Sequence, residues 1–298
     1  MTFIALALII VSAGLHATWN FLSKTGTPSC GYFFLTTLAA TVVTLPFSIF
    51  GPVDYLALPI GFWIPVFFSV LCEMAYVLSL ANGYRKAEIS FFYPMARSLP
   101  VVFTCAVSLI FHIGKPLTIP AVLGMVLVTA GCLIMPIGKF SDIRLKDYIN
   151  STMPFVLLGA FGTTGYTILD NIACSYLYHY QSGTNKMLIA LGYLGVIELG
   201  ILICSAIIIL CSQKERKIIR DIRKTSSPYL AGVFSVGAYT LVLVAMGMVS
   251  NVSFIQAFRQ LSLPIGVALG IFILKEKVSL PKLIGVTALL AGLIISCF

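Results

Sequence analysis

Two arginines lie inside apolar stretches that hold almost no other charge. Arg97 lies in the stretch 88–112, and Arg259 lies in the stretch 251–274. A guanidinium group is planar and permanently charged, and it binds carboxylates and phosphonates through two parallel hydrogen bonds. Arg97 and Arg259 are therefore the first candidates for binding the anionic part of a small molecule. The sequence predicts that Arg97→Gln abolishes this binding without unfolding the protein.

Prolines lie close to both arginines. Pro94 and Pro100 flank Arg97, and Pro264 follows Arg259. A proline removes a backbone donor and frees a carbonyl in a helix, and such irregular backbone is tolerated at membrane depth only where protein or a wet cavity satisfies it. We expect both arginines to face a cavity. The alternative is that each arginine pairs with an acidic side chain and only locks the helices together.

Other ionisable residues also lie within apolar stretches. Glu73, Asp170 and His16 are candidates for carrying a coupled proton, because charge inside a membrane is costly and marks functional positions by default. The alternative for the two acids is structural pairing, and for His16 it is a structural hydrogen bond. Glu198 lies among glycines, which indicates close helix packing instead.

Polar and aromatic residues share faces of the expected helices. Ser12, His16, Asn20 and Ser23 follow one another at spacings of four, four and three, which places them on one face. We expect a further set of side chains to line the cavity and shape it, with packing as the alternative for the aromatic ones. This set comprises Tyr93, Tyr166, Trp19, Asn20 and Gln260.

The composition indicates the elements that must hold these residues. Of 298 residues, 59% are hydrophobic and 10% are charged, against about 25% charged in soluble proteins. A membrane-spanning helix needs about 20 apolar residues, and the lengths and lack of alternation exclude a β-barrel. We therefore predict an all-α membrane protein of ten transmembrane helices. The ten stretches are 2–24, 30–50, 60–82, 88–112, 118–138, 153–178, 185–211, 228–249, 251–274 and 280–297.

An internal repeat divides the chain into two halves. Residues 110–135 align without gaps with residues 271–296, and the matches include Pro120 with Pro281, Gly124 with Gly285 and Gly131 with Gly292. The repeat predicts five-helix units at 1–138 and 153–298, joined by a loop at 139–152. Because five is odd, the second unit enters the membrane in the opposite direction. Inverted repeats around a central cavity are a recurring plan of secondary transporters.

The positive charges predict the orientation. Of the 19 Lys and Arg residues, two are Arg97 and Arg259, and only Lys115 and Lys186 follow even-numbered stretches. The remainder follow odd-numbered stretches, with a dense run at 214–224 that we assign to topology and to contact with anionic lipid headgroups. This bias places the odd loops in the cytoplasm and both termini outside. The net charge of +9 therefore does not indicate nucleic-acid binding.

The sequence lacks the marks of an enzyme or a metal protein. The eight cysteines are scattered singly without a Cys-x-x-Cys pair or a Cys/His cluster, so no metal site and no disulfide framework is predicted. No nucleophile elbow, phosphate-binding loop, zinc-protease helix or dinucleotide fingerprint occurs. We expect no catalytic residues and no cofactor.

Several segments together resemble the drug/metabolite transporter superfamily, specifically proteins with two EamA domains. They are GLHATWNFLSK (14–24), YPMAR (93–97), GYTILDN (165–171), FRQLSLPIG (258–266) and LKEK (274–277). The resemblance covers both halves. It implies ten helices in two inverted five-helix repeats around a central cavity. It also implies transport of small metabolites, with a branch associated with phosphonate use as the nearest pattern.

The expected function is secondary transport by alternating access. The substrate would be a small anionic or zwitterionic metabolite, similar to an amino acid or a phosphonate, and the setting a bacterial inner membrane. The alternative is export of cationic or neutral drug-like compounds, with the acidic residues as recognition groups. Substrate and lipid are the expected partners, and the sequence leaves monomer and homodimer open.

Overall fold

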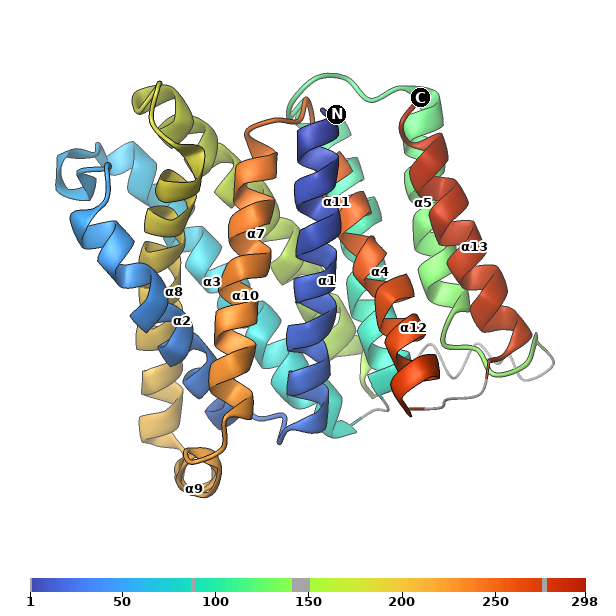
Figure 1. The fold of residues 1–298 in the computed structure, drawn as a ribbon, viewed down its shortest axis with the longest axis horizontal. Helices are drawn as coiled ribbons and strands as arrows, with labels where there is room; N and C mark the ends of the chain where they lie inside the picture. The colour runs from blue at the N-terminus through green and yellow to red at the C-terminus, as the bar shows by residue number, and fades with distance from the viewer. Residues whose placement is uncertain (1, 87–88, 141–150, 275–277) are drawn as a thin grey trace.

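A computed structural model describes residues 2–86, 89–140, 151–274 and 278–298, and these residues form helices and turns without a strand. Each of the ten predicted apolar stretches is helical. The helices lie side by side in one bundle, with both termini at the same end (Figure 1). The predicted repeat loop at 139–152 lies largely outside the described residues.

The helices of the first predicted half are α1 (Phe3–Thr25), α2 (Cys30–Phe50), α3 (Ile60–Lys86), α4 (Ile89–Ile110) and α5 (Ile119–Ile134). The helices of the second are α7 (Met153–Tyr180), α8 (Lys186–Cys211), α9 (Gln213–Ile222), α10 (Ser227–Met246), α11 (Val252–Phe258), α12 (Ser262–Leu274) and α13 (Leu280–Ile295). Two 3-10 turns, η1 (Tyr55–Ala57) and η3 (Arg259–Leu261), complete the described elements.

The protein is a helical membrane protein. Among the described residues, α1, α2, α3, α8 and α10 are long and apolar enough to cross a membrane, and shorter apolar helices cover Pro94–Ile110, Ile119–Ile134 and Leu280–Ile295. Large apolar side chains are exposed on the outside of the bundle; Phe50, for example, is 85% exposed. Because water does not favour such a surface, lipid must cover it.

Each half packs against the other through pairs of helices. α3 packs on α7, α1 on α10, α2 on α8, and α5 on α13. Serine and threonine side chains begin several of these helices: Ser29 Oγ accepts from Tyr32 N at 3.0 Å at α2, and Thr118 and Ser279 cap α5 and α13 in the same way. The capping side chains satisfy backbone donors that the helix itself leaves open.

The α5–α13 pair is a close approach of two backbones through glycine. A Cβ atom on Gly131 would lie 2.6 Å from Gly285 O, and one on Gly124 would lie 2.5 Å from Gly292 O. Real Cβ atoms are not found at such distances, so a side chain at these positions would force the helices apart. The four glycines therefore set the distance between α5 and α13.

Gly131→Ala is expected to lower the free energy of unfolding by about 1–3 kcal/mol, since overpacking a close contact costs this amount. The check is the melting temperature of the purified protein in detergent. Gly14→Ala in α1 is the matched control, because a Cβ there meets nothing within 4 Å. Equal melting temperatures for the two variants would contradict the close approach.

The ninth predicted span is interrupted where its charged residue lies. α11 ends at Phe258, η3 follows at Arg259–Leu261, and α12 begins at Ser262. Pro264 explains the break: it lacks the N–H that would bond Gln260 O, and its ring crowds that carbonyl. By contrast, α4 continues as an α-helix through Pro94 and Pro100.

The basic run at 214–224 is not a plain loop, as the sequence suggested, but contains α9, which lies across the end of the bundle opposite the termini (Figure 1). Glu215 on α9 is only 5% exposed. Its Oε2 accepts from Gly31 N at 2.8 Å, and its Oε1 pairs with Arg85 at 2.5 Å. α9 thereby ties the start of α2 to the end of α3.

Candidate functional site

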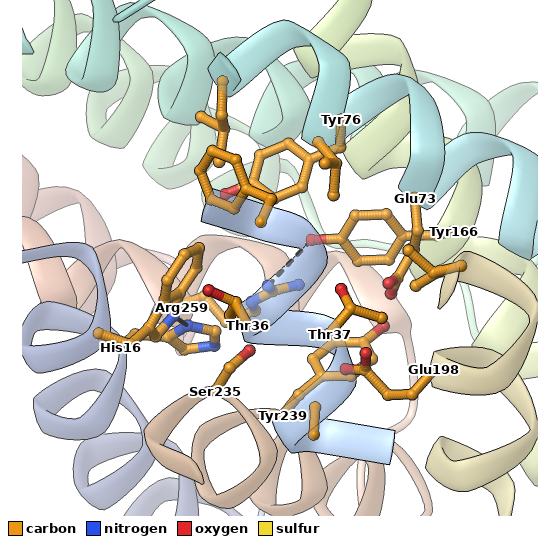
Figure 2. Close-up of a pocket in the computed structure, with 16 residues that line it drawn as sticks. His16, Thr36, Thr37, Glu73, Tyr76, Tyr166, Glu198, Ser235, Tyr239 and Arg259 are labelled. Atoms are coloured by element: carbon orange, nitrogen blue, oxygen red, sulfur yellow. Dashed lines mark hydrogen bonds between the residues drawn. The ribbon is translucent and has the colours of Figure 1, made fainter. Parts of the chain in front are cut away.

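A partly open pocket lies between the two predicted halves, and its space, counted out to the open mouth, is about 660 Å³. α1, α2 and α3 line it from the first half, and α7, α8, α10 and η3 line it from the second. Figure 2 shows its polar side chains turned toward a shared space. The lining residues are His16, Trp19, Phe33, Thr36, Thr37, Ala40, Glu73, Tyr76, Val77, Leu80, Tyr166, Glu198, Ile201, Ser235, Tyr239 and Arg259.

Arg259 is the arginine that lines the pocket, and it is 2% exposed. Its Nη2 donates to Tyr166 Oη at 3.1 Å, as the dashed line in Figure 2 marks, and its Nη1 donates to Thr167 Oγ1 at 3.5 Å. The guanidinium carbon also lies 5.3 Å from the ring centre of Tyr239. Nε has no partner, and no ion pair joins Arg259 to a carboxylate, among the described residues. The guanidinium keeps donors for a ligand.

Arg97 lies behind this site and is not among the residues that line the pocket. It is 2% exposed, and its Nη2 donates to Arg259 O and to Ser262 Oγ, each at 3.1 Å. Arg259 O belongs to the backbone of the break between α11 and α12. Arg97 therefore holds the backbone segment that carries Arg259. Arg259 lines the pocket itself, and Arg97 supports it from outside the pocket.

His16 and Trp19 form one edge of the pocket. Trp19 Nε1 donates to His16 Nδ1 at 2.8 Å, and Asn20 Nδ2 donates to His16 O at 2.6 Å. Because Nδ1 accepts, a neutral His16 ring carries its proton on Nε2, which is buried without a partner among the described residues. His16 thus offers a second donor near Arg259. Asn20 supports α1 and is not among the lining residues.

Glu73 and Glu198 are the carboxylates that line the pocket. Glu198 is 8% exposed, and Glu73 is half-buried. Neither has a hydrogen bond or an ion pair within the described part of the chain. Glu73, a predicted candidate for carrying a proton, lies where a proton or a cation in the pocket can reach it. Glu198 is expected from its glycine neighbours to serve helix packing, and it also lies at the pocket.

Asp170 lies outside the pocket, fully buried beside it. Three hydroxyl groups donate to its carboxylate: Tyr193 Oη at 2.7 Å, Ser69 Oγ and Tyr239 Oη. These donors come from α8, α3 and α10, while Asp170 belongs to α7. The carboxylate therefore joins four helices, and Tyr239 connects it to the pocket wall.

The remaining predicted site residues have mixed placements. Tyr166 lines the pocket and packs edge-on against Tyr76 and Tyr239. Gln260 is fully buried, donates from Nε2 to Gln256 O at 3.1 Å and is not among the lining residues. The Tyr93 side chain lies outside the described part of the structure.

Sequence reasoning missed the contribution of α2. Thr36, Thr37 and Phe33 line the pocket, but the segment 30–50 carries no charge and is recognisable from sequence only as a span. The available signal was the pair of adjacent threonines in an otherwise apolar part of this segment, Thr36 and Thr37. Hydroxyl groups in membrane helices can bond their own backbone, as Thr36 Oγ1 does to Tyr32 O at 3.1 Å, so the signal carries little weight alone.

Comparisons with known proteins identify the fold but no family. No protein-family model and no curated protein matches the sequence. A solved structure described only as "Crystal structure of protein" superposes with a TM-score of 0.65 at 13% identity, over 98% of this chain and 94% of the other. This likeness shows the fold alone. The chain spans almost the whole of that structure, so the helix bundle is an architecture found elsewhere.

Proposed function

We propose that the protein is a secondary transporter of a small anionic or zwitterionic metabolite in a bacterial inner membrane. The observation that carries the proposal is a pocket between two helix sets, lined by a buried arginine that pairs with no carboxylate among the described residues. Burying an unpaired charge is costly, and a ligand that neutralises it offsets the cost. The protein would move this ligand without changing it.

The packing supports two inverted repeats at 1–138 and 153–298, as in drug/metabolite transporters with two EamA domains. The sequence repeat makes Gly124 equivalent to Gly285, and Gly131 equivalent to Gly292. In the bundle Gly124 meets Gly292, and Gly131 meets Gly285. Exchanging the two halves turns one contact into the other, which is the pattern that a two-fold relation produces. The same exchange relates the α3–α7 pair to the α10–α1 pair.

Alternating access requires contacts between the halves to break at each end in turn. At the end that carries α9, Glu215 joins the second half to Gly31 and Arg85 of the first. Beside it, Tyr32 Oη and Ser227 Oγ lie 3.0 Å apart, and Ser227 Oγ donates to Leu22 O at 3.3 Å. Opening the pocket toward this end would separate both groups of contacts.

Glu215→Gln is expected to speed hydrogen exchange at the start of α2 and in α9, by about tenfold, because it removes the ion pair with Arg85 that closes this end. The measurement is peptide-level hydrogen exchange on the protein in lipid nanodiscs. Asp221→Asn is the matched control, since it removes the same charge from an exposed position on the same helix. Unchanged exchange in Glu215→Gln would contradict the closing role.

The test of transport combines binding and flux. Ligands that bind only the folded state raise its melting temperature, so a panel of organic anions, phosphonates, amino acids and organic cations is screened on the purified protein. The compounds that stabilise it are then supplied as radiolabelled solutes to liposomes containing the protein. Uptake above that of empty liposomes supports the proposal, and binding without uptake overturns it.

A second candidate is export of cationic compounds, favoured by the two carboxylates at the pocket. Stabilisation and uptake of cations alone, lost on replacing Glu73 or Glu198 and kept on replacing Arg259, would support this candidate and contradict the first.

A further inference from the structure

We infer that the pocket is divided by charge, and that its substrate carries one anionic and one cationic group at the same time. This inference rests on the proposed transport function and goes beyond it, because it excludes simple anions and simple cations as the preferred substrates. Arg259 and His16 would hold the anionic group. Glu73 and Glu198 would hold the cationic group.

The first observation is that opposite charges share one pocket without pairing. Arg259, Glu73 and Glu198 all line it. The ion pair found among the described residues is that of Arg85 with Glu215, at the end of the bundle. If Arg259 formed an ion pair with one of the two carboxylates, their charges would cancel and neither group would be available to a ligand. Here the positive and negative groups remain apart and available.

The second observation is how the groups are distributed. In the view of Figure 2, His16 and Arg259 lie on one side of the pocket, and Glu73 and Glu198 lie on the other. Arg259 Nη2 donates a hydrogen bond to Tyr166 Oη, with 3.1 Å between the two atoms. The Arg259 guanidinium carbon is 5.7 Å from the Tyr166 ring centre and 5.3 Å from that of Tyr239. These contacts hold the guanidinium against the two rings.

The third observation is that one of the two carboxylates, Glu198, is buried without a partner among the described residues. Glu198 is 8% exposed and has no hydrogen bond or ion pair within the described residues. A buried carboxylate normally has a partner. Thr37 and Ser235 also line the pocket and supply neutral hydroxyl groups. The missing partner of Glu198 is therefore a cationic group of the ligand, such as an ammonium.

Together these observations define a recognition rule. An anion alone would satisfy Arg259 and bring its charge toward two carboxylates, and a cation alone would satisfy the carboxylates and approach Arg259. A molecule with both groups satisfies both sides and suffers neither repulsion. Specificity then arises from penalties on the wrong ligands as well as from contacts with the right one.

The test compares compounds that share a carbon skeleton and differ by the presence or absence of one charged group. Three sets are used: alanine, propionate and ethylammonium; phenylalanine, 3-phenylpropionate and 2-phenylethylammonium; 2-aminoethylphosphonate, ethylphosphonate and ethylammonium. In at least one set, the compound with both charges should raise the melting temperature more than both of its partners. The proposal is overturned if no set shows this order.

The variants assign the two sides. Glu73→Gln with Glu198→Gln should weaken binding of the doubly charged compound by about tenfold or more, and should bring its affinity close to that of the matched anion. Arg259→Gln should bring it close to that of the matched cation. Asp221→Asn, exposed on α9, is the charge control and should leave the order unchanged. If the compound with both charges still binds more tightly than its matched anion and cation in both pocket variants, the assignment of the two sides is wrong.

Folding is checked in the same experiment. Glu198→Gln without ligand should keep or raise the melting temperature, because the side chain has no partner to lose among the described residues. A fall of several degrees would show a structural role and overturn the inference. Measurements of uptake separate the two proposals. Binding without uptake contradicts transport alone. Uptake of simple anions that is unchanged by Glu73→Gln and Glu198→Gln contradicts only the inference that the pocket is divided by charge.

Discussion

Replacing Arg259 with glutamine is expected to abolish uptake and to weaken substrate binding by about thirtyfold or more. A charge-assisted contact in a desolvated site is worth about 2–5 kcal/mol when one partner is truncated. Glutamine is neutral and shorter, so it cannot reproduce the contact with an anionic group. The measurements are radiolabelled uptake into liposomes and the ligand-induced rise in melting temperature.

Two variants make this result specific. Arg259→Lys keeps the charge but loses the planar fork that bonds Tyr166 and Thr167, so it should recover part of the binding. Arg97→Gln should also reduce uptake, and it should lower the melting temperature, because Arg97 bonds the backbone at the break rather than the pocket. Uptake lost in Arg97→Gln with an unchanged melting temperature, and kept in Arg259→Gln, would reverse the two roles.

The helices could be predicted from sequence because lipid imposes a simple rule on them. A segment must be long and apolar to span the membrane, and every predicted stretch is helical. α9 was not predicted, because it is short, charged and amphipathic and so does not resemble a membrane span. It also depends on contacts with α2 and α3, which are distant in sequence. Glu215 looks like one charge in a basic run until Gly31 and Arg85 are placed beside it.

The site could be predicted only in part. The type of a residue indicates how costly it is to bury its side chain in a membrane, but it does not indicate which neighbouring helix or cavity the side chain faces. Both arginines are buried inside the bundle, because a charged side chain that faced lipid would be energetically costly. Of the two, only Arg259 is among the pocket-lining residues. Their depth and flanking prolines are similar in sequence. The difference lies in which neighbour each helix face meets, and that is decided by packing between the halves. The glycines near Glu198 do pack closely, Gly195 against Thr44 and Gly200 against Val70, but they do not indicate that Glu198 itself lines the pocket.

Asp170→Leu is expected to destabilise the protein more than Gly131→Ala or the substitutions at the pocket do. The substitution leaves the hydroxyl groups of Ser69, Tyr193 and Tyr239 without their acceptor in a buried position. Each orphaned donor costs about 1–3 kcal/mol, so a total of about 3 kcal/mol or more is expected, which lowers the melting temperature by about 6 °C or more. Thermal unfolding in detergent measures it.

Asp170→Asn separates the structural role of this residue from the proton-carrying role that the sequence suggested. Asparagine keeps one oxygen as an acceptor but cannot carry a proton. If Asp170 mainly joins helices, the melting temperature falls by less than in Asp170→Leu, and a pH gradient drives uptake as in the unsubstituted protein. If uptake loses its response to the gradient while the melting temperature is unchanged, Asp170 carries the coupling proton. Glu73→Gln is the comparison, because Glu73 lines the pocket and has no hydroxyl partners to lose among the described residues.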